Sequence, residues 1–143
     1  MRYSVTKALL CAVSILLCCH CKTAYQSTVA AVEVPPECEE FKALVLAEWK
    51  EKRSQEGKYY QMGDSLTSFI QLNGVSRCFQ SLDTTRLKLI LGSPSISDAP
   101  IFAYFLDKRC ILYKSPCSWL NIEYNPTNGM VNRIQIQKMN WTD

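Results

Sequence analysis

The chain has 143 residues, of which 48% are hydrophobic, so it can bury the core of one domain. Its formal charge is +3, but Arg2 and Lys7 supply two of the sixteen basic residues. The remaining fourteen, from residue 22 onward, stand against thirteen acidic residues, and this near balance argues against a nucleic-acid-binding surface.

The start of the chain is typical of an export signal. A short basic stretch precedes an apolar run of about twelve residues, 8–19. This run has the length of a signal-peptide core and is too short to cross a membrane. We therefore expect the chain to be exported.

The end of the apolar run resembles the lipobox of bacterial lipoproteins. In that motif a Leu lies three positions before the Cys that is lipidated, and Leu16-Leu17-Cys18-Cys19 has this spacing. We interpret residues 1–19 as a signal peptide with a lipobox, and Cys19 as the lipidated residue that becomes the mature N-terminus. Cys18 and Cys21 remain alternative acceptors, and ordinary cleavage after Ala31 is the alternative to lipidation.

The next segment, residues 20–35, has neither a helical nor a strand pattern and runs into Pro35-Pro36. We interpret it as a flexible tether. Residues 36–143 are then predicted to form a single folded domain.

A long amphipathic helix is predicted from Glu37 to Ser54. Its apolar residues recur at intervals of three and four, which places them on one face: Cys38, Phe41, Leu44, Val45 and Trp49. Glutamates crowd its first turn and basic residues its last turn, as the helix dipole favours. A loop from Lys58 to Asp64 is expected next, before a short helix that ends at Asn73-Gly74.

A short capped helix is predicted within Ser81–Ser95. Asp83 can accept a hydrogen bond from the first turn, Gly92 can take a positive φ just past the end, and Pro94 prevents continuation. The apolar residues lie at helical spacing: Leu87, Ile90 and Leu91. Because so short a helix is unstable alone, we expect its leucines to be buried against the rest of the domain.

Three strands are predicted after this helix. The first, Ile101 to Leu106, is an unbroken apolar run, which indicates burial on both faces. The other two, Trp119–Asn125 and Met130–Lys138, alternate between apolar and polar residues, which indicates one buried face each.

The loop between the last two strands sets their register. A two-residue loop would place Ile122 opposite Gln135, whereas a three-residue loop, Thr127–Gly129, places it opposite Ile134. We therefore expect the longer loop, with Gly129 in a left-handed conformation. Together the elements predict an α+β domain of two layers, with N-terminal helices packed on a three-stranded antiparallel sheet.

Two stretches of this domain resemble the SmpA/OmlA family of outer-membrane assembly lipoproteins, also called BamE. Residues 81–94, SLDTTRLKLILGSP, are similar to its signature G-M-T-x-x-x-V…L-G-x-P, and residues 120–131 are similar to its final hairpin. The resemblance covers about residues 81–137 and extends to the fold of the β-lactamase inhibitory protein. It implies a BamE-like fold and, by analogy, a role in outer-membrane protein insertion. No lipid-contacting or partner-contacting residue of the family can be placed on this chain.

Four cysteines lie in the predicted domain: Cys38, Cys78, Cys110 and Cys117. In an oxidising compartment we expect disulfides rather than a zinc site, because closely spaced Cys pairs are absent. Cys110 and Cys117 flank the connection between the first two predicted strands, and a chain reversal returns Cys78 toward Cys38. We predict these two pairings, with a turn of Cys78 toward the hairpin as the alternative.

No residue pattern predicts catalysis. The only histidine, His20, lies beside the export signal, which excludes a His-based catalytic or metal site in the domain. The carboxylates are scattered and no Gly-rich phosphate loop is present. We therefore expect no enzyme activity, no cofactor and no metal.

The predicted function is that of a bacterial envelope lipoprotein that faces the periplasm, in the outer membrane. It would be held to the membrane by its N-terminal lipid, and it would bind another envelope protein through its sheet face or a helix edge. The alternative is a periplasmic inhibitor or immunity protein whose sheet blocks the active site of an enzyme.

Overall fold

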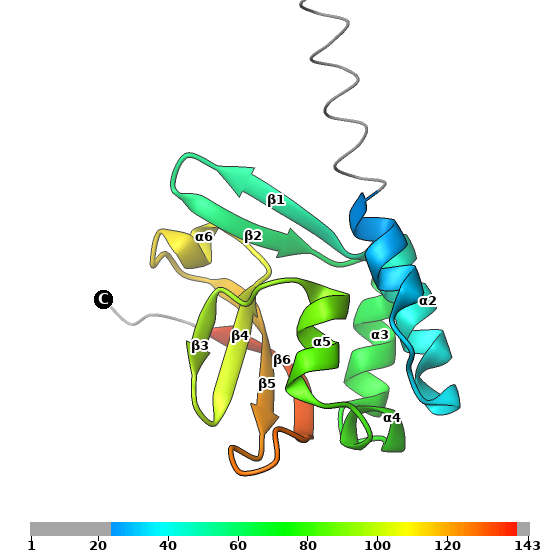
Figure 1. The fold of residues 1–143 in the computed structure, drawn as a ribbon. Coiled ribbons are helices and arrows are strands. Elements are labelled where there is room, and N and C mark those ends of the chain that lie inside the picture. Colours follow the sequence, from blue (N-terminus) through cyan, green and yellow to red (C-terminus); the bar gives the residue numbers. More distant parts are fainter. Residues whose placement is uncertain (1–23, 140–143) are drawn as a thin grey trace, which may run out of the picture.

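The computed structural model describes residues 24–139, which form an α+β domain with two antiparallel sheets (Figure 1). The smaller sheet is a hairpin of β1 (Lys50–Ser54) and β2 (Gly57–Gln61). The larger sheet has four strands in sequence order: β3 (Ile96–Asp98), β4 (Ile101–Phe105), β5 (Cys117–Tyr124) and β6 (Val131–Met139). The prediction of a single three-stranded sheet is therefore wrong, because it lacked the separate hairpin and the short edge strand β3.

The helices precede most of the larger sheet in the chain. After a helix at residues 24–31 they are, in order, a 3-10 turn η1 (Pro36–Cys38), α2 (Glu39–Glu48), α3 (Asp64–Asn73), α4 (Arg77–Gln80), α5 (Thr84–Leu91) and α6 (Lys108–Ile111). Figure 1 shows α2 to α5 gathered on one side of the larger sheet. One hydrophobic core lies between these layers and also includes Trp49 and Tyr60 from the region of the hairpin. Within the described part of the chain, no helix is long and apolar enough to cross a membrane.

The folded part of the chain begins before residue 36. Residues 24–31 are helical, Val29 is fully buried, and both Val29 and Val32 belong to the core. Part of the segment interpreted as a tether, 20–35, is therefore a packed helix. The sequence indicates this helix only weakly, through the helical spacing of Tyr25, Val29 and Val32 at intervals of four and three residues. Cys19 and the rest of the predicted export signal lie outside the described residues.

The long helix predicted from Glu37 to Ser54 is wrong in its second half. The helix α2 ends at Glu48, and Trp49 is already extended, with φ −89° and ψ 126°. The residues after it pair with β2, from Lys50 opposite Gln61 to Ser54 opposite Gly57. Trp49 nevertheless stays buried, because the hairpin stacks Tyr60 on its ring.

The helix α5 is as predicted. Its first turn is capped by Asp83, whose carboxylate accepts a hydrogen bond from the Arg86 N–H at 2.8 Å. The three apolar residues of its buried face are fully buried: Leu87, Ile90 and Leu91. Gly92 follows with φ 84° and ψ −168°, a positive-φ conformation that is more extended than the left-handed one expected.

Replacing Gly92 by Ala is expected to lower the free energy of unfolding by about 1 to 3 kcal/mol, because this φ/ψ region is open to glycine almost alone. A Cβ here would meet the nearest atom, the Tyr60 hydroxyl, at 3.6 Å, so the cost comes from backbone strain and not from a clash. Chemical denaturation of the variant measures it. Ser93→Ala, at the exposed neighbouring position, is the control and should change stability little. Equal stability of both variants would contradict the positive φ assigned to Gly92.

The register of the final hairpin is confirmed. Ile122 lies opposite Ile134 and Leu120 opposite Ile136, so apolar residues face each other as the loop comparison predicted. Gly129 has a φ of 72°. The loop is longer than three residues, because a shift after Glu123 pairs Tyr124 with Val131.

Candidate functional site

The C-terminal end of α5 is surrounded by aromatic side chains from four separate segments. The last carbonyls of a helix have no partner within it. Here four consecutive carbonyls, two at the end of α5 and two just beyond it, each accept one side-chain hydrogen bond. Tyr25 Oη donates to Ile90 O at 2.6 Å, Trp49 Nε1 to Leu91 O at 2.9 Å, Tyr104 Oη to Gly92 O at 2.8 Å, and Tyr60 Oη to Ser93 O at 2.5 Å. Through these four donors, the helix at residues 24–31, the end of α2, β2 and β4 all bind the C-terminal end of α5.

Three of these rings also pack on one another. The Trp49 and Tyr60 rings are stacked, with centroids 4.8 Å apart and an interplanar angle of 17°. Tyr104 meets both edge-on, at 5.6 Å from Trp49 and 5.2 Å from Tyr60. Such pairs each add about 0.5 to 1.5 kcal/mol beyond the area they bury, so this cluster stabilises the packing around the end of α5.

A cleft of about 770 Å³ opens beside the aromatic cluster. Its apolar lining includes Tyr25, Leu46, Ala47, Trp49, Tyr60 and Leu91. Its polar lining consists of Gln26 and four consecutive residues of β1: Lys50, Glu51, Lys52 and Arg53. We call this the β1 cleft.

The β1 cleft runs along the free edge of β1. Neighbouring residues of a strand point to opposite faces, so a cleft lined by four consecutive residues extends along the strand's edge. In the described structure β1 pairs with β2 alone, and of β2 only Tyr60 lines the cleft. The other edge of β1 therefore offers backbone N–H and C=O groups without a strand partner.

The rim of the β1 cleft is basic. Arg53 and Glu51 form an exposed ion pair, with Arg53 Nε 2.8 Å from Glu51 Oε1. Lys50 and Lys52 are exposed and make no ion pair with any described residue. The four charges of the rim therefore sum to +2.

The phenols beneath the cleft are neutral hydrogen-bond donors. Burial, and secondarily the charge of Glu51, raises the pKa of Tyr25 to about 12. Burial is also the main cause that raises the pKa of Tyr60 and of Tyr104. None of the three phenols can act as a general base near neutral pH.

The raised pKa of Tyr25 predicts a loss of stability in alkali. The phenol has an ordinary pKa of 10.0 and one of about 12 in the folded protein, so the native state holds its proton more tightly. Its contribution is complete below pH 10 and is lost as the pH rises through about 12. We expect Tyr25→Phe to be less stable than the parent at pH 7 by about 1 kcal/mol, because the Ile90 carbonyl loses its donor.

The measurement is urea denaturation at pH 7, 10 and 11.5. The difference between the parent and Tyr25→Phe should shrink toward the highest pH, since the parent alone titrates at this position. Tyr113→Phe, at a tyrosine that is 73% exposed, is the control. A difference that grows with pH would contradict the account.

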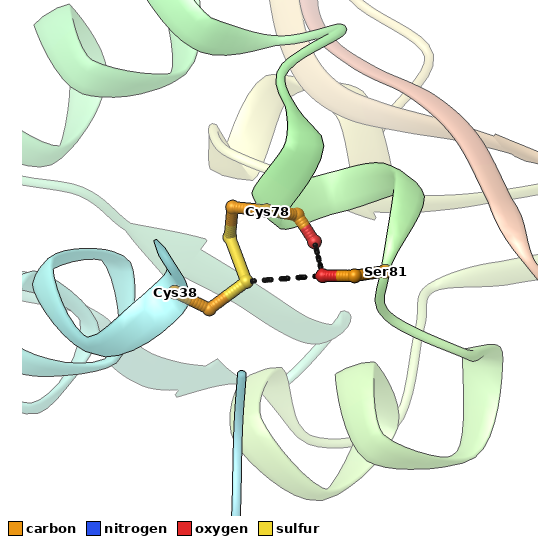
Figure 2. The surroundings of a disulfide bond; sticks show 3 residues. All are labelled: Cys38, Cys78 and Ser81. Atoms are coloured by element: carbon orange, nitrogen blue, oxygen red, sulfur yellow. Dashed lines mark hydrogen bonds between the residues drawn. A yellow bond between two sulfur atoms is a disulfide. The ribbon is translucent and has the colours of Figure 1, made fainter. Parts of the chain in front are cut away.

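The structure joins Cys38 and Cys78 in a disulfide (Figure 2). The bond links η1 to α4, across a sequence separation of 40 residues and a Cα–Cα distance of 4.8 Å. The Ser81 hydroxyl donates to the Cys78 carbonyl at 2.8 Å and lies 3.8 Å from the Cys38 sulfur. This bond holds the start of α2 against the segment that leads into α5.

Cys110 and Cys117 are brought together but are two buried thiols, so the second predicted bridge is absent from this structure. The Cys110 thiol donates to Ser118 O at 3.2 Å. Burial, followed by a hydrogen bond with Cys117, raises the pKa of Cys110 to about 12. A thiol of this kind is a poor nucleophile, so Cys110 is no candidate for a catalytic nucleophile.

The second candidate surface is the face of the larger sheet that points away from the core. Partner binding through a sheet face was expected from the sequence. Phe105 and Trp119 lie opposite each other on this face, both half-buried, with ring centroids 6.4 Å apart and nearly parallel planes. Trp119 Nε1 donates to Gln137 Oε1 at 2.9 Å, which fixes the indole. We call this the outer sheet face.

Within residues 24–139, no group of three or more His, Cys, Asp or Glu residues is placed to hold a metal ion. No protein-family model matches the chain, and no curated protein or solved structure matches it either.

Proposed function

We propose that the protein is a membrane-tethered envelope lipoprotein of bacteria that binds another envelope protein and catalyses no reaction. The observation that carries the binding role is the β1 cleft. It combines an aromatic floor, a basic rim and a free strand edge, and these are the features of a peptide-recognition surface.

The tethered part of the proposal rests on the N-terminal signal and on the oxidised pair. A disulfide between Cys38 and Cys78 is expected of a protein that folds in an oxidising compartment such as the periplasm. If Cys19 carries the lipid, residues 20–23 separate it from the helix at 24–31, and the Cα atoms of residues 19 and 24 are at most about 18 Å apart. The β1 cleft, which Tyr25 lines, would then lie close to the membrane surface.

A quantitative capture experiment tests the binding role. The parent and a Lys50→Glu/Lys52→Glu variant are used to capture proteins from envelope extracts, and the recovered proteins are compared by mass spectrometry. The matched control is Arg77→Glu/Lys138→Glu, which changes two exposed charges outside the cleft by the same amount. We expect one partner to be lost with the cleft variant and retained with the control. Equal recovery with both variants would reject the cleft as the binding surface.

Lipidation is tested separately by mass spectrometry of the mature N-terminus. The expected peptide begins at Cys19 and carries acyl chains. An unmodified peptide that begins at Val32 would reject the tether.

The second candidate function is a periplasmic inhibitor or immunity protein. The outer sheet face favours it, because the Phe105–Trp119 pair could cover the opening of an active site. A partner whose capture depends on Trp119 and not on the cleft lysines would support this alternative.

A further inference from the structure

The residues that line the β1 cleft indicate which kind of protein segment it binds. Strand residues opposite each other share one face, so Glu51 and its partner Tyr60 lie on the same side of the hairpin. Tyr60 is buried beside Trp49 and lines the cleft. Lys50 and Lys52, one position away on either side of Glu51, point to the opposite side.

A strand that paired with the free edge of β1 would present its side chains to these two sides in turn. Residues on the Tyr60 side would lie over the aromatic floor, next to the Glu51–Arg53 ion pair, and apolar side chains there lose contact with water. Residues on the other side would lie beside Lys50 and Lys52, where directly opposite charges of unlike sign stabilise a strand pair. The complementary segment therefore alternates between apolar and acidic residues, over about five residues to match the length of β1.

The same charges argue against two other occupants. A second copy of β1 would bring lysines against lysines, which is how natural edge strands avoid pairing with themselves. A segment rich in Lys or Arg would meet a rim whose charges already sum to +2. The basic rim favours an acidic strand and disfavours a second copy of β1 or a basic segment.

We propose that the β1 cleft binds an extended, acidic segment of the partner protein, which adds a strand to the free edge of β1 and places apolar side chains over Trp49 and Tyr60. This inference rests on the proposed function, and names the kind of segment that the same site takes. Backbone hydrogen bonds provide the docking, and the alternation of side chains provides the specificity.

The probe is an acetylated, amidated eight-residue peptide that alternates Glu and Leu. It is titrated into the isotope-labelled mature protein, and the backbone amide signals are followed by NMR. We expect saturable shifts confined to residues 50–53 and to the residues that line the cleft. A peptide alternating Lys and Leu tests charge, one alternating Glu and Ser tests the apolar contacts, and an N-methylated Glu/Leu peptide tests strand pairing. Each should bind at least tenfold more weakly.

The protein variants complete the test. Lys50→Glu/Lys52→Glu should weaken binding of the Glu/Leu peptide at least tenfold, and Arg77→Glu/Lys138→Glu should leave it unchanged. Equal affinity for the Lys/Leu peptide, shifts confined to the outer sheet face, or dimerisation through β1 without peptide would each overturn the inference. If the envelope partner is still captured through the cleft lysines while no peptide binds, only the strand-addition inference fails. If the parent and the Lys50→Glu/Lys52→Glu variant capture the partner equally well, the proposed binding through the cleft fails as well.

Discussion

Replacing Trp49 by Ala is expected to lower the free energy of unfolding by about 3 to 5 kcal/mol, the range for large-to-small changes of buried aromatic residues. The indole is 4% exposed, stacks on Tyr60 and donates to the Leu91 carbonyl. Its loss removes both contacts and leaves the Leu91 carbonyl without its side-chain donor. Urea denaturation followed by circular dichroism measures the change without relying on Trp fluorescence.

Two further variants separate the causes. Trp49→Phe retains a ring in the stack but loses the hydrogen bond, so we expect a cost of about 1 to 3 kcal/mol. Trp119→Ala removes the half-buried indole of the outer sheet face, and should cost less than Trp49→Ala. If Trp49→Ala changes stability by less than Trp119→Ala, the aromatic cluster does not support the C-terminal end of α5.

The second large effect is expected from removal of the Cys38–Cys78 bond. In the chain-entropy description, a crosslink across 40 residues contributes about 3 to 4 kcal/mol, because it restricts the unfolded chain. The Cys38→Ala/Cys78→Ala variant should therefore lose about this much stability in a denaturation experiment without reductant. The parent in the presence of reductant should approach the same value.

Non-reducing peptide mapping provides the independent check on the pairing. We expect a linked peptide that contains Cys38 and Cys78, while Cys110 and Cys117 react with alkylating agents only after unfolding because both are buried. A peptide that joins Cys78 to Cys110 or Cys117 would contradict the structure. A linked Cys110–Cys117 peptide would restore the second pairing predicted from the sequence.

Local signals allowed some elements to be predicted well. The helix α5 carries its start and stop signals within a dozen residues, with Asp83 as its cap and Gly92 just past its end. The register of β5 and β6 followed from the parity of a single loop, since a slip of one residue would expose Ile122 and Ile134. In both cases the residues that decide the structure are neighbours in the sequence.

The β1 cleft could not be predicted because its parts come from distant segments with conflicting local signals. The basic residues of β1 also suit the last turn of a helix, so the apolar spacing that leads to Trp49 favoured one long helix. What decides for a hairpin is pairing with β2 and stacking of Tyr60, both of which are tertiary. Tyr25 reaches Ile90 across 65 residues, and no local pattern carries that contact.

Site-specific photo-crosslinking in living cells tests most directly that the β1 cleft is the working surface of the protein. A photoreactive p-benzoylphenylalanine is placed in the full chain at Gln26, which lines the cleft, or at Gln135, which lies on the outer sheet face opposite Asn121. We expect a crosslinked partner protein from position 26 that disappears when Lys50→Glu/Lys52→Glu is added, and none from position 135. A partner crosslinked from position 135 and not from position 26 would contradict this expectation.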